Sequence, residues 1–397
     1  MLRIALKMLR GDRAKYTGLL MGIAFTAFLV TFAASYFAGF MTRGFSLISE
    51  NASTDVWVMD PAVNSVELTI NMPANALDRV HNVQGVRFAT PLALGTLSAR
   101  FPNGHFQAFE VIGVDDATLA GAPLLRDGMA PTALHTPDAA IVDAGGTSGK
   151  LQTPIRKSDQ WPPDGAHLDV PTRELAAGDE LLVDGRRIKV VGNSSTLPRF
   201  PPRPLLYTTY GNAARILPRE QHLLTFVLVK AQDGVSSQQL AQRIEARTGL
   251  RARTTEDFKA DTVRWYLVNS EDVGDMGAMM ILAITVGFGT TGIMLYMFTY
   301  ENLKQYAVLK AMGAPRRTLR LMILIQAFVG GLIGAGLGLG VCAIVGGAIA
   351  PTGFPFRLMW FGPLLGVMGV LIVSLTAAAI SIRPVLRLAP GVVFAGR

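Results

Sequence analysis

The segment "DAGGTSGKL" (Asp143–Leu151) comes closest in this sequence to a motif that does chemistry, because it combines glycines with a lysine. A phosphate-binding loop has a glycine five residues before its Gly-Lys pair, and a Ser or Thr after the lysine to hold Mg²⁺. Here these two positions are Ala144 and Leu151. We therefore expect a flexible loop at this segment and no ATP site in this chain.

Five histidines and one cysteine are the other residues that could bind a metal or act in catalysis. No two histidines have i, i+4 spacing, and neither an HExxH motif nor a Cys/His cluster occurs. A G-x-S-x-G nucleophile motif is also absent. The sequence therefore predicts no enzyme and no metal site, although a metal or haem pocket assembled from distant residues stays an alternative. The histidines are His81, His105, His135, His167 and His222, and the cysteine is Cys342.

Four apolar segments are long enough to cross a membrane, because a membrane-spanning helix needs about 20 mostly apolar residues. Half of the 397 residues are hydrophobic, which agrees with a chain that lies partly in lipid. The predicted spans are residues 16–41, 276–300, 319–350 and 359–382, with a short external loop at 351–358. The first could be a cleaved signal peptide, but its apolar stretch is long for one, so we expect an uncleaved anchor. The predicted fold is an α-helical membrane protein in which one helix, a large domain at 42–275 and three further helices follow one another.

Lys and Arg residues near the ends of the spans predict the orientation of the chain. Thirteen of them lie in or beside residues 1–15, 301–318 and 383–397, opposed only by Asp12 and Glu301. We expect these segments to be cytoplasmic, so that both termini are cytoplasmic and the large domain lies outside. The rest of the chain has 24 Lys and Arg against 27 Asp and Glu, which argues against the basic face of a nucleic-acid-binding domain.

Residues 42–275 have the patterns of a mixed α+β domain. The Asp184-Gly185 pair predicts a hairpin turn, and Ser236 and Gly249 predict the start and the end of a helix. Residues 120–171 are rich in Pro, Gly, Asp and Thr, which predicts a long connection or insertion. The order of elements predicts two lobes, with strands at 55–60, 66–70, 106–114 and 223–231, a hairpin at 179–192, and helices at 73–83 and 236–249.

The predicted spans contain almost no ionisable residues, whereas transport of protons or ions usually needs Asp, Glu, His or Arg in the membrane. A hydrophobic path, or a lateral route for lipid-like molecules, suits these helices better. Small residues at four-residue spacing in 319–350 predict close helix packing, either on the span at 276–300 or 359–382 or at a contact that slides. These glycines are Gly330, Gly334, Gly338, Gly336 and Gly340.

The segment between the second and third spans, residues 301–318, predicts a short interfacial helix and a corner. Gly313 is placed to end the helix in the left-handed conformation, and Pro315 suits the first turn of the next helix. Ordinary positive-inside charge is an alternative explanation for its basic residues. The predicted polar arc holds Glu301, Asn302, Lys304 and Gln305, and the opposite, buried arc holds Leu303, Tyr306 and Ala307.

The same segment, "ENLKQYAVLKAMGAPRRTLRLMIL", resembles the cytoplasmic segment of FtsX/MacB-type ABC transporter permeases. The N-terminal "ALKMLRGDRAKYTGLLMGIAF" and the C-terminal "RPVLRLAPGVVF" resemble the corresponding ends of that family. "TYENLKQYAVLKAMGA" and "FKADTVRWYLVNS" are most similar to its DevC-like branch, the permeases of heterocyst-glycolipid-type exporters. The resemblance covers nearly the whole chain, apart from residues 120–171, and it implies a MacB-like periplasmic domain.

The resemblance also implies partners that the residue patterns do not show. Such permeases are homodimers in the bacterial inner membrane and work with a separate ABC ATPase subunit, which binds ATP and Mg²⁺. In related branches a membrane-fusion protein and an outer-membrane channel accept the substrate. The amphipathic helix at 1–15 would contact membrane lipids. The implied ATPase contact lies within Asn302–Ala314, at Asn302, Lys304, Tyr306, Leu309, Lys310, Gly313 and Ala314.

The function that the resemblance implies is that of the permease subunit of a mechanotransmission-type ABC exporter. ATP hydrolysis by the partner would move the periplasmic domain and export a hydrophobic or lipid-like substrate. Two alternatives stay open, an FtsX-type signal relay that controls a cell-wall hydrolase and a lipoprotein-release permease. No substrate residues can be assigned from the sequence.

Overall fold

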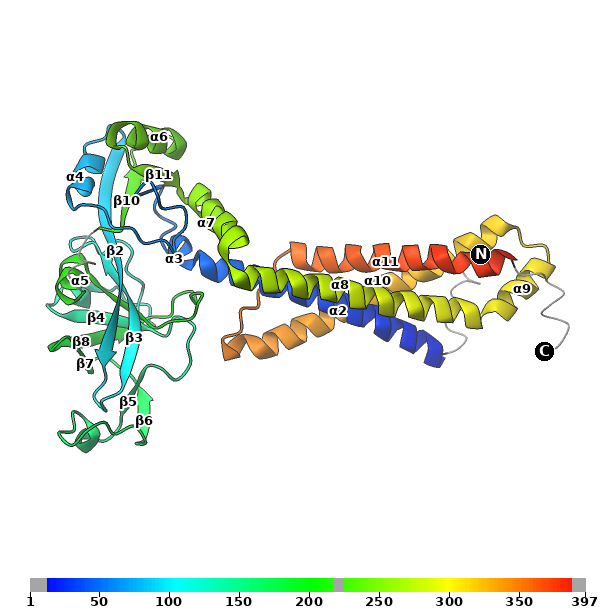
Figure 1. Ribbon diagram of the computed structural model, residues 1–397, viewed down its shortest axis with the longest axis horizontal. Coiled ribbons are helices and arrows are strands. Elements are labelled where there is room, and N and C mark those ends of the chain that lie inside the picture. The colour runs from blue at the N-terminus through cyan, green and yellow to red at the C-terminus, as the bar shows by residue number, and fades with distance from the viewer. Residues whose placement is uncertain (1–12, 218–223, 388–397) are drawn as a thin grey trace. The chain divides into compact units, whose positions relative to one another are not determined.

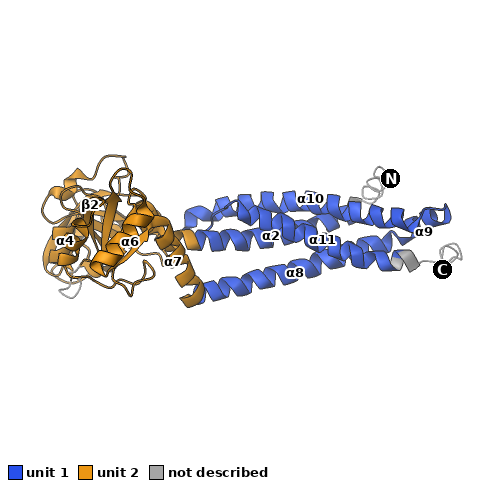
Figure 2. Ribbon diagram, turned by 90° about the horizontal axis from the view of Figure 1, so that it is seen from above, with its two compact units in different colours: residues 1–40, 271–397 blue, residues 41–270 orange. Residues whose placement is uncertain are grey.

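The computed structural model describes residues 13–217 and 224–387, and it divides into two compact units (Figure 1 and Figure 2). The helical unit comprises the chain up to Phe40 and from Glu271 onward, and the α+β unit comprises Met41–Ser270. The predicted helix at 1–15 and tail at 383–397 lie wholly or largely outside the described residues.

The helical unit contains four helices that are long and apolar enough to cross a membrane, among the residues that the structure describes. This agrees with the four predicted spans. The helices extend beyond the apolar stretches, since backbone hydrogen bonding continues into polar flanks; α8, for example, begins with Glu271 and Asp272, which favour a helix N-terminus. Its elements are α2 (Arg13–Gly44), α8 (Glu271–Glu301), α9 (Leu303–Ala311), α10 (Arg316–Ile349), the 3₁₀ turn η4 (Ala350–Thr352) and α11 (Phe361–Arg387).

The four long helices run alongside one another in both views, and α11 packs against both α8 and α10. Their shared core combines branched side chains with alanines, because helices in lipid gain stability from close van der Waals packing rather than from removal of apolar surface from water. This core includes Leu19, Ile23 and Ala27 of α2, Leu295 and Phe298 of α8, Leu319, Ile323 and Ala327 of α10, and Val370, Ala377 and Ala378 of α11.

The α+β unit is built on a nine-stranded sheet with the order β11-β1-β10-β2-β3-β9-β4-β8-β7. The strands are β1 (Val56–Met59), β2 (Val86–Arg100), β3 (Phe106–Val114), β4 (Ala139–Asp143), β7 (Glu180–Val183), β8 (Arg186–Asn193), β9 (Leu205–Thr209), β10 (Phe226–Ala231) and β11 (Arg251–Thr254); β5 (Gln152–Pro154) and β6 (Thr172–Glu174) form a separate pair. The helices are α3 (Ser46–Glu50), α4 (Asn75–His81), α5 (Tyr210–Ile216), α6 (Ser237–Thr248) and α7 (Thr255–Asn269), with 3₁₀ turns η1 (Thr132–His135) and η2 (Lys157–Asp159).

Strand β2 joins the two halves of this sheet. Its first part, from Val86 to Leu92, pairs with β10, and its second part, from Ala93 to Arg100, pairs with β3. Figure 1 shows this strand running from the region of α4 and β10 to the region of β3 and β7. The two groups of elements expected as lobes therefore share one continuous sheet, with apolar clusters along its length.

The predicted turn residues and helix caps of the α+β unit lie where the sequence places them. Asp184 and Gly185, both with positive φ, form the turn between β7 and β8. Ser236 caps α6 by accepting a hydrogen bond from the Gln239 amide, and Gly249 ends that helix in the left-handed conformation. These short-range predictions are confirmed because the responsible side chains act within a few residues of themselves.

One prediction about the α+β unit is wrong, and another range contains a strand that was not expected. Residues 66–70 are not a strand; the Val66 amide donates to the Thr262 hydroxyl instead of to a neighbouring strand. Residues 120–171, predicted to be a long connection or insertion, contain strand β4, which lies between β9 and β8 in the sheet and is fully buried. A strand of five buried residues has no polar-apolar alternation, so its Pro- and Gly-rich surroundings hid it.

Candidate partner-binding helix and the contacts that fix it

Helix α9 is a separate short helix between α8 and α10, closed by a glycine corner. Gly313 has φ +90°, and its amide donates to the Lys310 carbonyl at 3.1 Å while the Ala314 amide donates to Leu309 at 3.0 Å. Pro315 then precedes α10 in an extended conformation. These contacts confirm the predicted helix and corner, since glycine tolerates positive φ and proline cannot continue the first helix.

Tyr306 fastens α9 to the third long helix. Its ring is buried in the core of the helical unit, and its hydroxyl donates to Oε1 of Gln326 in α10 at 2.6 Å. Burial raises the pKa of the Tyr306 phenol above its usual value. Helix α9 is therefore held to α10 by a covalent corner and by a buried hydrogen bond.

The placement of Asn302 differs from the expectation. Its side chain is buried and its Nδ2 donates to the Phe298 carbonyl at 2.7 Å, so it belongs to the end of α8 rather than to an exposed arc. An asparagine that can bond to a nearby carbonyl need not face solvent. Tyr306 is also internal, so neither of these two candidate contact residues offers its side chain to a partner.

The exposed face of α9 combines polar and apolar side chains. Lys304 and Gln305 are exposed as predicted, and Gly313 is also exposed. Val308 of α9 and Met312, the residue that caps its C-terminus, were not predicted as contact residues and are 41% and 71% exposed. Their four-residue spacing from Lys304 was the available signal, because residues four apart share one face of a helix. The remaining candidates, Leu309, Lys310 and Ala314, are half-buried.

Three of the five candidate packing glycines lie against α2. A Cβ on Gly334 would lie 2.5 Å from Cγ2 of Ile23, and a Cβ on Gly338 would lie 2.3 Å from the carbonyl oxygen of Ala24. Gly330 lies in ordinary contact distance of the same helix. The predicted close packing is present, but its partner is the first long helix instead of the second or the fourth.

The other two glycines, Gly336 and Gly340, lie on a different face of α10. A Cβ on either would meet no described atom within 4 Å. The fourth long helix instead contacts Gly331, whose Cβ would lie 3.2 Å from Leu371. The glycine pattern therefore contains two kinds of position, one closely packed and one open.

Several hydroxyls of the long helices form hydrogen bonds within the helical unit. Thr26 of α2 lies 2.7 Å from the Thr291 hydroxyl and donates to the Gly287 carbonyl of α8 at 3.0 Å. Thr285 and Thr290 bond back to carbonyls of their own helix. A substitution of Gly287 by alanine would place Cβ 2.5 Å from Thr26, so this contact is close.

In the α+β unit, a buried ion pair fixes the short helix that follows α2. Arg199 donates to Oε2 of Glu50 at 2.8 Å and to the Ser46 hydroxyl at 2.7 Å, and both acceptors lie on α3. The Tyr207 hydroxyl also donates to Glu50. Burial raises the pKa of the Glu50 carboxyl, while Arg199 and the hydrogen bonds oppose that rise.

A second arginine of the same loop joins two carboxylates. Arg203 lies 3.2 Å from Glu67 and 3.5 Å from Glu110. Burial, followed by the nearby negative charge of Glu110, raises the pKa of Glu67, and Arg203 and a hydrogen bond from Tyr266 of α7 oppose the rise. The loop that carries Arg199 and Arg203 thus ties α3 to residues that contact α7, the helix before α8.

The glycine-rich segment after β4 does not have the geometry of a phosphate loop. The carboxylate of Asp143 accepts from the amides of Gly145 and Thr196 and from the Ser194 hydroxyl. The next element is strand β5, whereas a phosphate loop leads into a helix N-terminus. Within 13–217 and 224–387 no three His, Cys, Asp or Glu side chains gather around a possible metal position.

Comparisons with known proteins give one match in sequence and several in structure. No curated protein matches the chain. The periplasmic region of MacB from Actinobacillus actinomycetemcomitans is similar with 13% identity and a TM-score of 0.34, over 55% of this chain and 94% of that one. The extracellular domain of the noncanonic ABC-type transporter YknZ from Gram-positive bacteria has 11% identity and a TM-score of 0.31, over 51% and 98%.

A domain of a putative permease protein from Porphyromonas gingivalis is similar with 16% identity and a TM-score of 0.28, over 51% of this chain and 86% of that one. The sequence match covers residues 277–390 and is to the FtsX-like permease C-terminal family. This range contains most of α8, all of α9 and α10, and α11. The C-terminal part of the chain, with the short helix and its corner, is thus similar to the FtsX-like permease C-terminal family.

Proposed function

We propose that this chain is the permease subunit of a mechanotransmission-type ABC exporter, close to the DevC-like branch. A separate ATPase subunit, which binds ATP and Mg²⁺, docks on the cytoplasmic side of a homodimer in the bacterial inner membrane. Its cycle moves the α+β unit outside the cytoplasm and exports a hydrophobic or lipid-like substrate. A membrane-fusion protein and an outer-membrane channel then receive the substrate.

The exposed face of α9 carries this proposal. Val308 and Met312 are apolar, exposed and flanked by Lys304, which suits the mixed surface of a transient protein contact. The Tyr306–Gln326 hydrogen bond links the same helix to α10. Because packed helices move as stiff bodies rather than deforming continuously, a force applied at this face would reach the full length of α10.

The polarity of the long helices supports the exclusion of a polar transport path. Thr26 bonds with Thr291 and with the Gly287 carbonyl, so these hydroxyls take part in helix contacts. The predicted spans also contain almost no ionisable residues, which transport of protons or ions usually needs. This arrangement favours a mechanical role for the helices over conduction of ions.

The test is the ATPase activity of the partner subunit, co-expressed and purified with the full chain in lipid nanodiscs. Val308→Asp and Met312→Asp should weaken docking by about 1.4 kcal/mol or more, which is a tenfold loss of affinity. We expect a corresponding loss of co-purified ATPase and of permease-dependent activity.

The matched control is Ile155→Asp, which also replaces an exposed apolar residue, 56% exposed, but lies in the α+β unit. It should leave co-purification unchanged. Normal ATPase recovery with both α9 variants would contradict the proposed docking face.

A further inference from the structure

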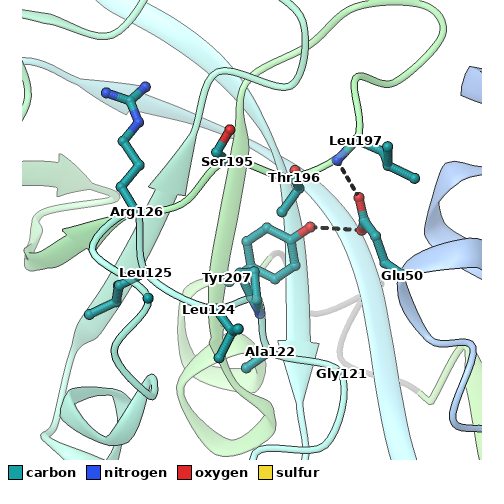
Figure 3. A pocket seen from close by; sticks show the side chains of 12 residues that line it. Glu50, Gly121, Ala122, Leu124, Leu125, Arg126, Ser195, Thr196, Leu197 and Tyr207 are labelled. Atoms are coloured by element: carbon teal, nitrogen blue, oxygen red, sulfur yellow. Dashed lines mark hydrogen bonds between the residues drawn. The ribbon is translucent and has the colours of Figure 1, made fainter.

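A cavity of about 590 Å³ opens in the α+β unit between two loops, 121–128 and 195–197, and the end of α3. In Figure 3, Glu50 and Leu197 lie to one side of Tyr207, and Leu124 and Leu125 of the other loop lie to its other side. Its volume lies within the range of about 300–1,000 Å³ that is usual for small-molecule sites. No residue of the cavity takes part in the function proposed above.

The mouth of the cavity combines polar side chains with exposed apolar ones. Leu124 is 63% exposed and Leu197 is 41% exposed. Met129, whose carbonyl accepts from the Leu125 amide at 3.1 Å, adds a third exposed apolar side chain close by. Large apolar side chains that gather at one opening are unusual on a solvated domain and mark a site that an apolar group covers.

Glu50 gives the cavity a hydrogen-bond acceptor that is not fully used. An ionised carboxylate offers about four acceptor positions. Three are occupied, by the Leu197 amide on Oε1 at 3.0 Å and by Arg199 and Tyr207 on Oε2. The side chain is 17% exposed, so a ligand can reach it. The remaining position on Oε1 can accept a hydrogen bond from a hydroxyl or N–H group of a ligand.

The charges of the lining are already compensated. Glu50 is paired with Arg199, and Arg126 is paired with Glu174 at 3.0 Å. A charged ligand would therefore lose its hydration without gaining a free counter-charge, which is costly in a partly buried site. The lining suits a molecule without net charge.

We infer that this cavity binds an uncharged amphiphile, with its apolar part against Leu124 and Leu197 and a hydroxyl or amide donor on Oε1 of Glu50. The biological meaning of this inference rests on the proposed function, because that function brings a hydrophobic or lipid-like substrate to the α+β unit. It also places the ligand on the ion pair that holds α3. A ligand in the cavity would thus alter the contacts of α3, the helix that directly follows α2.

The experiment uses a thiol at the mouth of the cavity in the full chain, reconstituted in nanodiscs. Cys342 is the only cysteine, so Cys342→Ala with Ser195→Cys gives a single reporter. The probes are 1-monooctanoylglycerol, octanoate and octylamine, which share a tail length but differ in charge. Saturating monooctanoylglycerol should slow maleimide labelling about fivefold, because a ligand that buries about 70–90% of its own surface in a pocket also covers the side chains that line it.

Octanoate and octylamine should need at least about tenfold higher concentrations for the same effect, because of their uncompensated charge. Leu124→Ser with Leu197→Ser, which alters only exposed side chains, should abolish the slowing. A reporter at Gln238→Cys on α6, an exposed position outside the cavity lining, should not respond to any probe.

Three outcomes would overturn the inference. Octanoate or octylamine could slow labelling at the same concentration as monooctanoylglycerol, or the probes could slow labelling of Gln238→Cys as much as that of Ser195→Cys. The third is that no probe slows labelling of Ser195→Cys in a saturable way. The labelling needs no ATPase. If the probes do not slow labelling but the Val308→Asp and Met312→Asp variants lose the ATPase, only the ligand site is refuted. If the probes slow labelling but those variants retain the ATPase, only the proposed docking of the ATPase is refuted.

Discussion

At the scale of single residues, Arg199 is a buried charge of the α+β unit that depends on its hydrogen-bond partners. Its side chain is 5% exposed and serves two groups of α3, the carboxylate of Glu50 and the hydroxyl of Ser46. A buried ion pair is not by itself strong evidence for stability, because both charges lose their hydration. Loss of one partner is severe, however, since the other charge stays buried and unpaired.

We predict that Arg199→Met destabilises the α+β unit by about 3 kcal/mol or more. The double variant Glu50→Gln with Arg199→Met should recover part of this loss, because it removes both charges together. Thermal unfolding, followed by circular dichroism on the full chain in detergent, measures both effects. A double variant that is less stable than Arg199→Met alone would contradict the explanation.

At the scale of secondary-structure elements, the glycines of α10 separate close packing from open surface. Gly338 lies against a backbone carbonyl of α2, which cannot move aside as a side chain can. Gly336, only two residues away, has no described neighbour near its missing Cβ. The same small residue thus has different roles on two faces of one helix, which the four-residue spacing alone did not distinguish.

We predict that Gly338→Ala lowers the stability of the helical unit, whereas Gly336→Ala leaves it unchanged or raises it slightly. Overpacking of this kind costs about 1–3 kcal/mol, and alanine is the better helix former by about 1 kcal/mol. Cys342 is buried in α10 and is the only cysteine of the sequence, so a thiol-reactive fluorophore reports the unfolding of this unit on heating. Equal unfolding temperatures for the two variants would refute the assigned packing.

At the scale of the whole molecule, the charge distribution and the two units together give a testable topology. The basic segments at the ends of the spans predict cytoplasmic residues 301–318 and an external α+β unit. Gln305 on α9 and Gln238 on α6 are both exposed and belong to different units. They should therefore face opposite sides of the membrane.

In a Cys342→Ala background, Gln238→Cys should react with a membrane-impermeant maleimide in intact spheroplasts, whereas Gln305→Cys should react only after permeabilisation. The expected difference follows from the barrier that the bilayer presents to a charged reagent. Labelling of both positions in intact spheroplasts would show that the predicted orientation is wrong, and mass spectrometry of the labelled protein provides the readout.

The sequence by itself determined the features that depend on local chemistry. Runs of apolar residues predicted four long helices, Asp184-Gly185 predicted a turn, and Gly313 with Pro315 predicted a corner. Each of these depends on residues within one helix turn or one hairpin, or on the length of an apolar stretch that the bilayer requires. They could be predicted because no distant partner decides them.

Only the tertiary structure decided which surfaces meet. It placed Asn302 and Tyr306 inside the helical unit, turned Gly334 and Gly338 toward α2, and brought Glu50, Leu124 and Leu197 around one cavity. These contacts join residues that lie far apart in the chain, and a helix with apolar residues on every side does not reveal which side faces a neighbour and which faces lipid. Long-range packing and the choice among chemically similar faces are therefore properties of the folded chain.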